Sequence, residues 1–179
     1  DSIAIFAPTY GMYAVCAAIN NVGVKQFLLN NDFSININQF FNGLSPNIKV
    51  VFICSPNNPS GNTQSLESIE QVVSRYRGIV VVDEAYIDFC PEKTSINLIT
   101  RYPNIIVLQT FSKAWAMAGA RIGVAFANQL LIDTLSKVKF PYNIGLPSLR
   151  ILDKAIEKSS SSKIYINKII DEREKVRLK

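Results

Sequence analysis

The sequence contains no histidine and only three cysteines among its 179 residues. Without histidine, the chain cannot form a Ser-His or Cys-His catalytic pair, and a zinc ion lacks its usual nitrogen ligands. Cys16, Cys54 and Cys90 are odd in number, lie far apart and form no CxxC motif, which favours a reducing, cytoplasmic environment. We therefore expect no metal site, and proton transfer falls to lysine, tyrosine or carboxylate groups.

Long apolar runs and nucleotide-binding motifs are also missing. The sequence has no run of eighteen apolar residues and no signal-peptide pattern, so neither a membrane span nor a secretion signal is expected. The phosphate-binding patterns GxxxxGK[ST] and GxGxxG are absent. The net charge of +5 comes from scattered lysines and arginines rather than a basic stripe, which argues against nucleic-acid binding.

Short apolar runs alternate with longer amphipathic stretches along the chain. Most of the runs are rich in valine and isoleucine on both faces, as in strands that helices cover from both sides. They span residues 3–6, 24–29, 49–54, 78–83, 104–110 and 121–127. Helical spacing occurs at residues 10–23, 65–77 and 128–139, with Ser65 as an expected N-cap. This alternation predicts an α/β fold with a doubly wound, mostly parallel sheet that binds ligands beyond the carboxyl ends of its strands.

The last part of the chain differs in composition from the rest. KSSSSK, at residues 158–163, is of low complexity and predicts a turn or short linker. Between Ile166 and Val176, apolar residues recur at helical spacing among charges, which indicates the start of a further helix. The chain begins at Asp1 without methionine and stops within this helical pattern, so we expect it to be part of a longer protein.

Clusters of polar residues follow four of the strand-like runs. They are APTYGMY (7–13), CSPNNPSG (54–61), VVVDEAYIDF (80–89) and TFSKAWAMAGARIG (110–123). Because ligands bind beyond the carboxyl ends of strands in such sheets, we expect these clusters to contribute to one site. The candidate site residues are Tyr10, Asn58, Asp83, Tyr86, Thr110, Ser112, Lys113 and Arg121.

Each candidate, taken alone, also has an ordinary structural explanation. Tyr10 suits packing, PNNPSG suits a turn, and Asp83 suits a strand-end cap or an ion pair. The hydroxyl and guanidinium groups of the last cluster suit helix caps and salt bridges. Lys113 precedes an apolar run, so it is either a surface lysine at a helix start or a sheltered amine with a lowered pKa. A neutral lysine is a nucleophile and a base.

Taken together, the candidates meet the needs of one cofactor, pyridoxal phosphate. This cofactor requires a lysine for its Schiff base and a carboxylate that keeps its ring nitrogen protonated. Its phosphate requires hydroxyl groups, a guanidinium and backbone amides. Its ring requires an aromatic stacking partner and donors at the phenolic oxygen. The functional interpretation of Lys113 is that a sheltered site keeps its amine available as an imine or a free base.

In this order and at these spacings, the four clusters resemble the histidinol-phosphate aminotransferases, a fold-type-I pyridoxal-phosphate family of histidine biosynthesis. The resemblance runs essentially from Asp1 to Lys179. It implies that residues 1–157 are a cofactor-binding large domain with a seven-stranded-type sheet, incomplete at its N-terminus. It also implies that residues 158–179 are a linker and the start of a helix that leads to a small C-terminal domain absent from this chain.

The resemblance assigns a role to every candidate residue. Lys113 is similar to the Schiff-base lysine and Asp83 to the partner of the ring nitrogen. Asn58 and Tyr86 are similar to the pair that binds the phenolic oxygen, and Tyr10 to the ring-stacking aromatic. The implied phosphate ligands are Thr110, Ser112 and Arg121. The sequence departs from the family at Ser60, where threonine is usual, and at Gln109, where arginine is frequent.

The implied activity is a transamination that converts histidinol phosphate and 2-oxoglutarate to imidazole-acetol phosphate and glutamate. The family resemblance further implies a homodimer, with no membrane or nucleic-acid partner. Alternatives remain open at this level: an amino-acid-phosphate decarboxylase, another class I or II aminotransferase, a non-catalytic cofactor-binding module, or a doubly wound domain with a different ligand. Product analysis with histidinol phosphate separates the enzymes, and titration of the chain with pyridoxal phosphate shows whether it binds the cofactor as it stands.

Overall fold

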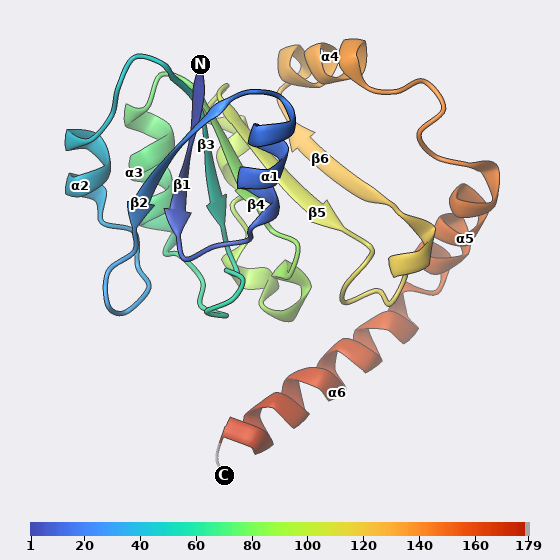
Figure 1. The fold of residues 1–179 in the computed structure, drawn as a ribbon. Coiled ribbons are helices and arrows are strands. Elements are labelled where there is room, and N and C mark those ends of the chain that lie inside the picture. The colour runs from blue at the N-terminus through green and yellow to red at the C-terminus, as the bar shows by residue number, and fades with distance from the viewer. Residues whose placement is uncertain (178–179) are drawn as a thin grey trace.

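A single sheet organises the structure, which is a computed structural model that describes residues 1–177. Its strand order is β2-β1-β3-β4-β5-β6 (Figure 1). The first five strands are parallel to their neighbours, and β6 runs antiparallel to β5. The strands are β1 (Ser2–Ala7), β2 (Gly23–Leu28), β3 (Ile48–Cys54), β4 (Ile79–Asp83), β5 (Ile105–Thr110) and β6 (Gly123–Ala127). They confirm the six predicted runs, so the described residues supply six strands of a sheet for which the resemblance implies seven.

Helices cover the sheet on both faces. α1 (Met12–Ile19) lies on one face, whereas α2 (Ile37–Asn42) and α3 (Leu66–Arg75) lie on the other (Figure 1). The side chain of Ser65 accepts a hydrogen bond from the Ser68 amide, so it caps α3 as the sequence predicts. The helices on opposite faces give the doubly wound arrangement that the alternation of strands and helices predicts.

Alternation of side chains along the strands separates two apolar cores. Ala4 and Phe6 face the larger core, together with α2 and α3, whereas Ile3 and Ile5 face α1. The same alternation operates in β4, where Val80 and Val82 belong to the larger core. Because successive strand residues point to opposite faces, Asp83 at the end of β4 is turned toward the α1 side. This placement brings it within reach of α1.

The remaining α-helices follow β6 in the sequence. They are α4 (Gln129–Val138), α5 (Leu146–Glu157) and α6 (Ser159–Arg177), and α6 extends away from the sheet on the side to which β1 and β3 point (Figure 1). The prediction of a turn or linker at 158–163 is wrong for most of that segment, because Ser159 begins α6. Serine in a helix costs only roughly half a kcal/mol relative to alanine. The contact between α6 and residues 87–89 favours the continuous helix, with Ile166 buried.

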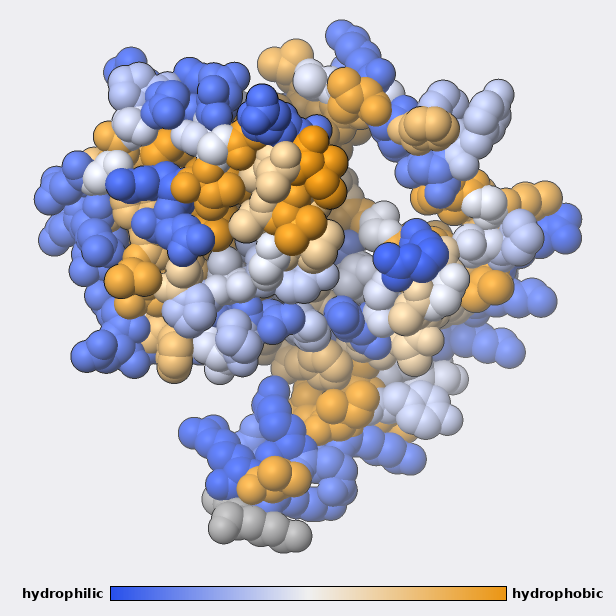
Figure 2. All heavy atoms as spheres, in the orientation of Figure 1, coloured by the Kyte–Doolittle hydropathy of each residue, from blue (hydrophilic) through white to orange (hydrophobic). Residues whose placement is uncertain are grey.

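The outer surface of α1 is apolar. Met12, Val15 and Ile19 are exposed there, and Figure 2 shows hydrophobic side chains gathered over this part of the molecule. On the inner side of the same helix, Tyr13 and Ala17 are buried against the sheet. Tyr13 and Ala17 therefore anchor α1 to the sheet, and Tyr13 also contacts Asp83 at the end of β4.

Candidate active site

All eight candidate residues line one cavity of about 380 Å³. The cavity lies at the carboxyl ends of β3, β4 and β5, where Cys54, Asp83 and Leu108 are neighbours across the sheet. It is completed by the loops that follow β1, β3, β4 and β5. Its lining residues are Tyr10, Cys54, Asn58, Asp83, Ala85, Tyr86, Leu108, Gln109, Thr110, Ser112, Lys113 and Arg121. The structure thus brings together residues that are more than a hundred positions apart in the sequence.

Asp83 is a half-buried carboxylate held by two donors. Its Oδ2 accepts a hydrogen bond from the Tyr13 hydroxyl at 2.6 Å. Its Oδ1 accepts one from the backbone amide of Ala85 at 3.0 Å. Each carboxylate oxygen has two acceptor positions, so both oxygens retain capacity for a further donor. Asp83 therefore presents an oriented acceptor group to the cavity.

Lys113 lines the cavity from the loop that follows β5, with its Nζ 5.4 Å from the centre of the Tyr86 ring. The structure corrects the expectation of a sheltered lysine, because Lys113 is exposed. The apolar character of its sequence neighbours serves packing instead: Ala114 is buried, and the Trp115 indole donates to Asp88 Oδ1 at 3.1 Å. These two residues fix the loop while leaving the lysine amine at the opening of the cavity.

The three implied phosphate ligands come from the end of β5 and from the loop that joins β5 to β6. The Thr110 hydroxyl accepts from the Ser112 amide at 3.1 Å and donates to the Ile122 carbonyl at 3.2 Å. Arg121 is exposed, has a left-handed backbone conformation with φ of 56°, and donates to the Ala118 carbonyl within its own loop. The guanidinium keeps further donors that can bind an anion. The group consequently combines hydroxyls and a positive charge beside Lys113.

Buried Asn57 lies between the loops that carry Tyr10 and Asn58. Asn57 donates to the Pro8 carbonyl at 3.0 Å and accepts from the Thr9 hydroxyl at 2.9 Å. It therefore ties the loop that carries Tyr10 to the loop that carries Asn58. The Tyr10 side chain is 44% exposed and packs edge-on against Tyr13, with ring centres 5.7 Å apart.

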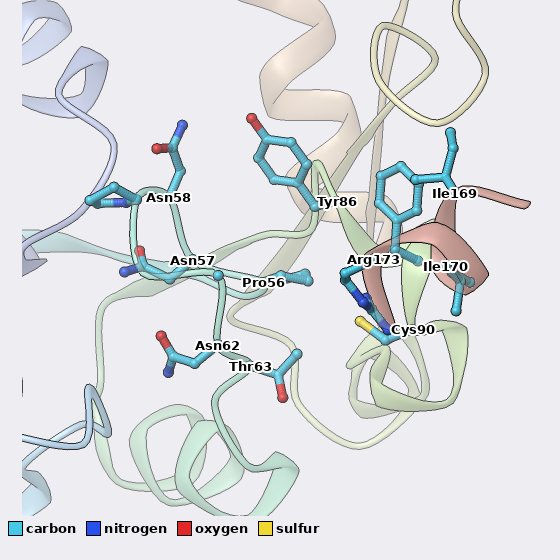
Figure 3. Close-up of a pocket in the computed structure, with 13 residues that line it drawn as sticks. Pro56, Asn57, Asn58, Asn62, Thr63, Tyr86, Cys90, Ile169, Ile170 and Arg173 are labelled. Carbon is cyan, nitrogen blue, oxygen red and sulfur yellow. The ribbon is translucent and has the colours of Figure 1, made fainter. Parts of the chain in front are cut away.

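A second, larger cavity of about 770 Å³ adjoins the first and shares Asn58 and Tyr86 with it. Figure 3 shows Tyr86 between the loop at Asn58 and helix α6, which contributes Ile169, Ile170 and Arg173. Its walls are mainly apolar apart from the asparagines and the arginine. The cavity at the strand ends is thus open toward a wider space bounded by α6.

Glu84 follows Asp83 directly and is almost fully buried. Its two carboxylate oxygens accept four hydrogen bonds, from the Thr94 hydroxyl, the amide and hydroxyl of Ser95, and the Gln109 side chain. The distances range from 2.6 to 2.9 Å. This network ties Glu84, which directly follows β4, to the segment at Thr94 and Ser95 and to Gln109 of β5.

We expect Glu84→Ala to lower the free energy of unfolding by about 3 kcal/mol, because it leaves several buried donors without an acceptor. Chemical denaturation of the variant and the wild type measures this difference. Glu92→Ala, which removes an exposed carboxylate from the following turn, is the control and should change stability by less than about 0.5 kcal/mol. A loss for Glu84→Ala as small as that of the control would contradict the role given to the network.

Four features of the site were not predicted from the sequence: Tyr13, Asn57, Glu84 and the contact between Trp115 and Asp88. Tyr13 and Asn57 lie within the clusters already singled out, so their positions offered a signal, but their partners lie 48 to 70 residues away. Within residues 1–177, no group of histidine, cysteine, aspartate or glutamate side chains could hold a metal ion. None of the helices in this range combines the length and apolar character needed to cross a bilayer.

Comparison with known proteins gives consistent matches along the chain. The family model described as aminotransferase class I and II matches residues 1–178. The histidinol-phosphate aminotransferases of Cytophaga hutchinsonii and Flavobacterium psychrophilum are 43% and 42% identical to the chain, over 99% and 98% of its length. In both cases the match covers 51% of the relative, so the chain spans about half the length of these curated relatives.

Solved structures share the fold. The histidinol-phosphate aminotransferase of Clostridium acetobutylicum superposes with a TM-score of 0.89 at 22% identity, over 98% of this chain and 54% of that one. The enzyme of Sinorhizobium meliloti, solved in complex with pyridoxal-5'-phosphate, gives a TM-score of 0.89 at 20% identity, over 98% of this chain and 49% of that one. These likenesses establish the α/β architecture with a mostly parallel sheet.

Proposed function

Because this chain belongs to the class I and II aminotransferase family, we propose that it carries the cofactor site of a pyridoxal-phosphate-dependent histidinol-phosphate aminotransferase. The observation that supports this most strongly is the shared cavity, in which a lysine amine, a carboxylate, two tyrosines and an anion-binding group face one another. The 43% identity to a curated histidinol-phosphate aminotransferase supports the choice of substrate.

The residues present fit the cofactor. Its aldehyde requires a primary amine, and Lys113 lies at the cavity with its amine exposed. Its ring nitrogen, when protonated, requires a negative partner, and Asp83 is a carboxylate with free acceptor capacity. Its phosphate requires several donors, which the Ser112 hydroxyl and the Arg121 guanidinium provide, and Thr110 adds one when its hydroxyl turns from the Ile122 carbonyl. The donor set therefore matches the cofactor at both ends and on its ring.

We assign the remaining roles on the same basis. Asn58 and Tyr86 can donate to the phenolic oxygen of the cofactor, and Tyr10 can stack on its ring. When bound, pyridoxal phosphate supplies an electrophilic carbon and a ring that withdraws electron density from the reacting carbon. Lys113 Nζ would take a proton from the reacting carbon of the substrate as general base and then deliver it to the former aldehyde carbon of the cofactor as general acid. Asp83 holds the positive charge of the ring nitrogen during this transfer.

We propose that residues 1–157 form the cofactor-binding domain and that residues 158–179 lie outside it. The position of α6, which extends away from the sheet, supports this division (Figure 1). By its resemblance to the histidinol-phosphate aminotransferases, the protein is proposed to be a homodimer. The three cysteines, which are free thiols in the structure, support a cytoplasmic location.

Product analysis of the complete gene product tests the function. With pyridoxal phosphate, histidinol phosphate and 2-oxoglutarate, we expect equal amounts of glutamate and imidazole-acetol phosphate. The control is the Lys113→Ala protein, which should form neither. The L-threonine-O-3-phosphate decarboxylase of Porphyromonas gingivalis shares the fold with a TM-score of 0.78, so threonine phosphate is assayed in parallel. The proposal would be contradicted if threonine phosphate released carbon dioxide while the assay with histidinol phosphate and 2-oxoglutarate formed no glutamate.

A further inference from the structure

We propose that Tyr13 is a positioning residue that fixes the Asp83 carboxylate for a protonated ring nitrogen of the cofactor. This inference rests on the proposed function. It extends that function to a residue that is not among those that line the cavity. Tyr13 lies in the first turn of α1, and the hydrogen bond to Asp83 joins residues 70 positions apart. It connects the helix on one face of the sheet directly to the end of β4.

Packing fixes the direction in which the Tyr13 hydroxyl points. The side chain is 8% exposed. Its ring stacks on Phe52 with centres 4.9 Å apart and an interplanar angle of 20°, and Tyr10 meets it edge-on. A phenol held between two aromatic rings in this way has little freedom to turn from the carboxylate. The donor is therefore in place before any ligand binds.

Two donors together determine the orientation of the carboxylate. Tyr13 occupies one position on Oδ2, and the Ala85 amide occupies one on Oδ1. With both oxygens held, rotation of the carboxylate would break at least one hydrogen bond to a charged group, which is among the stronger hydrogen bonds in proteins. The remaining acceptor positions of Asp83 are thereby held in a fixed geometry at the cavity wall.

Tyr13 also leaves the negative charge of the carboxylate available. Burial, followed by the charge of Asp83, raises the pKa of the Tyr13 hydroxyl, so it remains a neutral donor throughout the physiological range. Within residues 1–177, the ion pairs of the structure do not include Asp83. A carboxylate held only by neutral donors beside a cavity is suited to bind a cation, as a protonated ring nitrogen is.

The test compares two cofactors in two proteins. Tyr13→Phe keeps the ring and its stacking on Phe52 but removes the donor. The probes are pyridoxal phosphate and its deaza analogue, in which carbon replaces the ring nitrogen. We expect Tyr13→Phe to weaken binding of pyridoxal phosphate about tenfold, as for loss of one charge-assisted hydrogen bond. Binding of the analogue should change by less than twofold, because it offers no cation to Asp83.

A double-mutant cycle gives an independent readout of the same claim. If Tyr13 acts through Asp83, Tyr13→Phe should have no further effect on pyridoxal-phosphate affinity in the Asp83→Asn protein. Thermal unfolding of the cofactor-free variants establishes that they are folded. The positioning role would be overturned if Tyr13→Phe lowered the affinity for both probes equally. It would also be overturned if Tyr13→Phe lowered the pyridoxal-phosphate affinity by the same factor in the Asp83→Asn protein as in the wild type. Failure of the wild-type protein to bind pyridoxal phosphate would instead overturn the proposed function.

Discussion

Lys113→Ala is expected to abolish turnover, with a loss of about 10⁴-fold or more, and to remove the visible absorbance of covalently bound cofactor. Two functions disappear with the one amine, namely the link to the cofactor aldehyde and the proton transfer at the substrate carbon. The exposed position of Lys113 means that the substitution leaves no buried cavity, so the fold should be retained. Absorbance titration with pyridoxal phosphate and steady-state kinetics measure the two effects.

Lys137→Ala provides the matched control for this variant. Lys137 is an exposed lysine in the last turn of α4 and lies outside both cavities described above. Its removal should leave cofactor binding and turnover within twofold of the wild type. Retention of the visible absorbance band by Lys113→Ala, at the intensity seen with Lys137→Ala, would contradict the assignment of the reactive amine.

Asp83→Asn has the second largest expected effect. The amide has nearly the same shape as the carboxylate but carries no charge, so it cannot stabilise a protonated ring nitrogen as electron density moves toward it. We expect kcat to fall by about 10² to 10³-fold, the range found when one preorganised electrostatic contact is removed from an active site. Attachment of the cofactor to Lys113 should persist, because that step does not depend on the ring charge.

The visible absorbance therefore distinguishes the role of Asp83 from that of Lys113, because Asp83→Asn should retain the absorbance and Lys113→Ala should lose it. Asp133→Asn, which neutralises an exposed aspartate in α4, is the control for the change of charge and should leave kcat unchanged. Turnover of Asp83→Asn close to that of Asp133→Asn would show that the carboxylate does not support the reaction.

The strands could be predicted because their signal is local. Runs such as Val80–Val82 are apolar on both faces, which is the pattern of a buried parallel strand. Two helices were not predicted, α2 and α5. α2 has only six residues and is defined by a cap, in which the Asn36 side chain accepts from the Gln39 amide. Such a short helix derives its stability from tertiary packing, here the burial of Phe40, rather than from its own sequence.

The sequence predicts many of the residues that line the cavity but not the hydrogen bonds that hold them in place. Motifs at the ends of strands identified eight of the twelve residues that line the cavity. The contacts of Tyr13 and Glu84 depend on which distant segments pack together, and no local pattern carries that information. The shelter expected for Lys113 was wrong because its apolar neighbours, Ala114 and Trp115, pack inward while the lysine does not.

The most direct test of the central claim is to locate the cofactor on the chain. The protein is incubated with pyridoxal phosphate, reduced with borohydride to fix the link to an amine, and digested for peptide mass analysis. We expect the added mass on Lys113 at stoichiometric amounts, and the same result for the Lys137→Ala variant. Absence of the label from Lys113, or its distribution over several surface lysines in equal amounts, would show that Lys113 is not the amine that binds the cofactor.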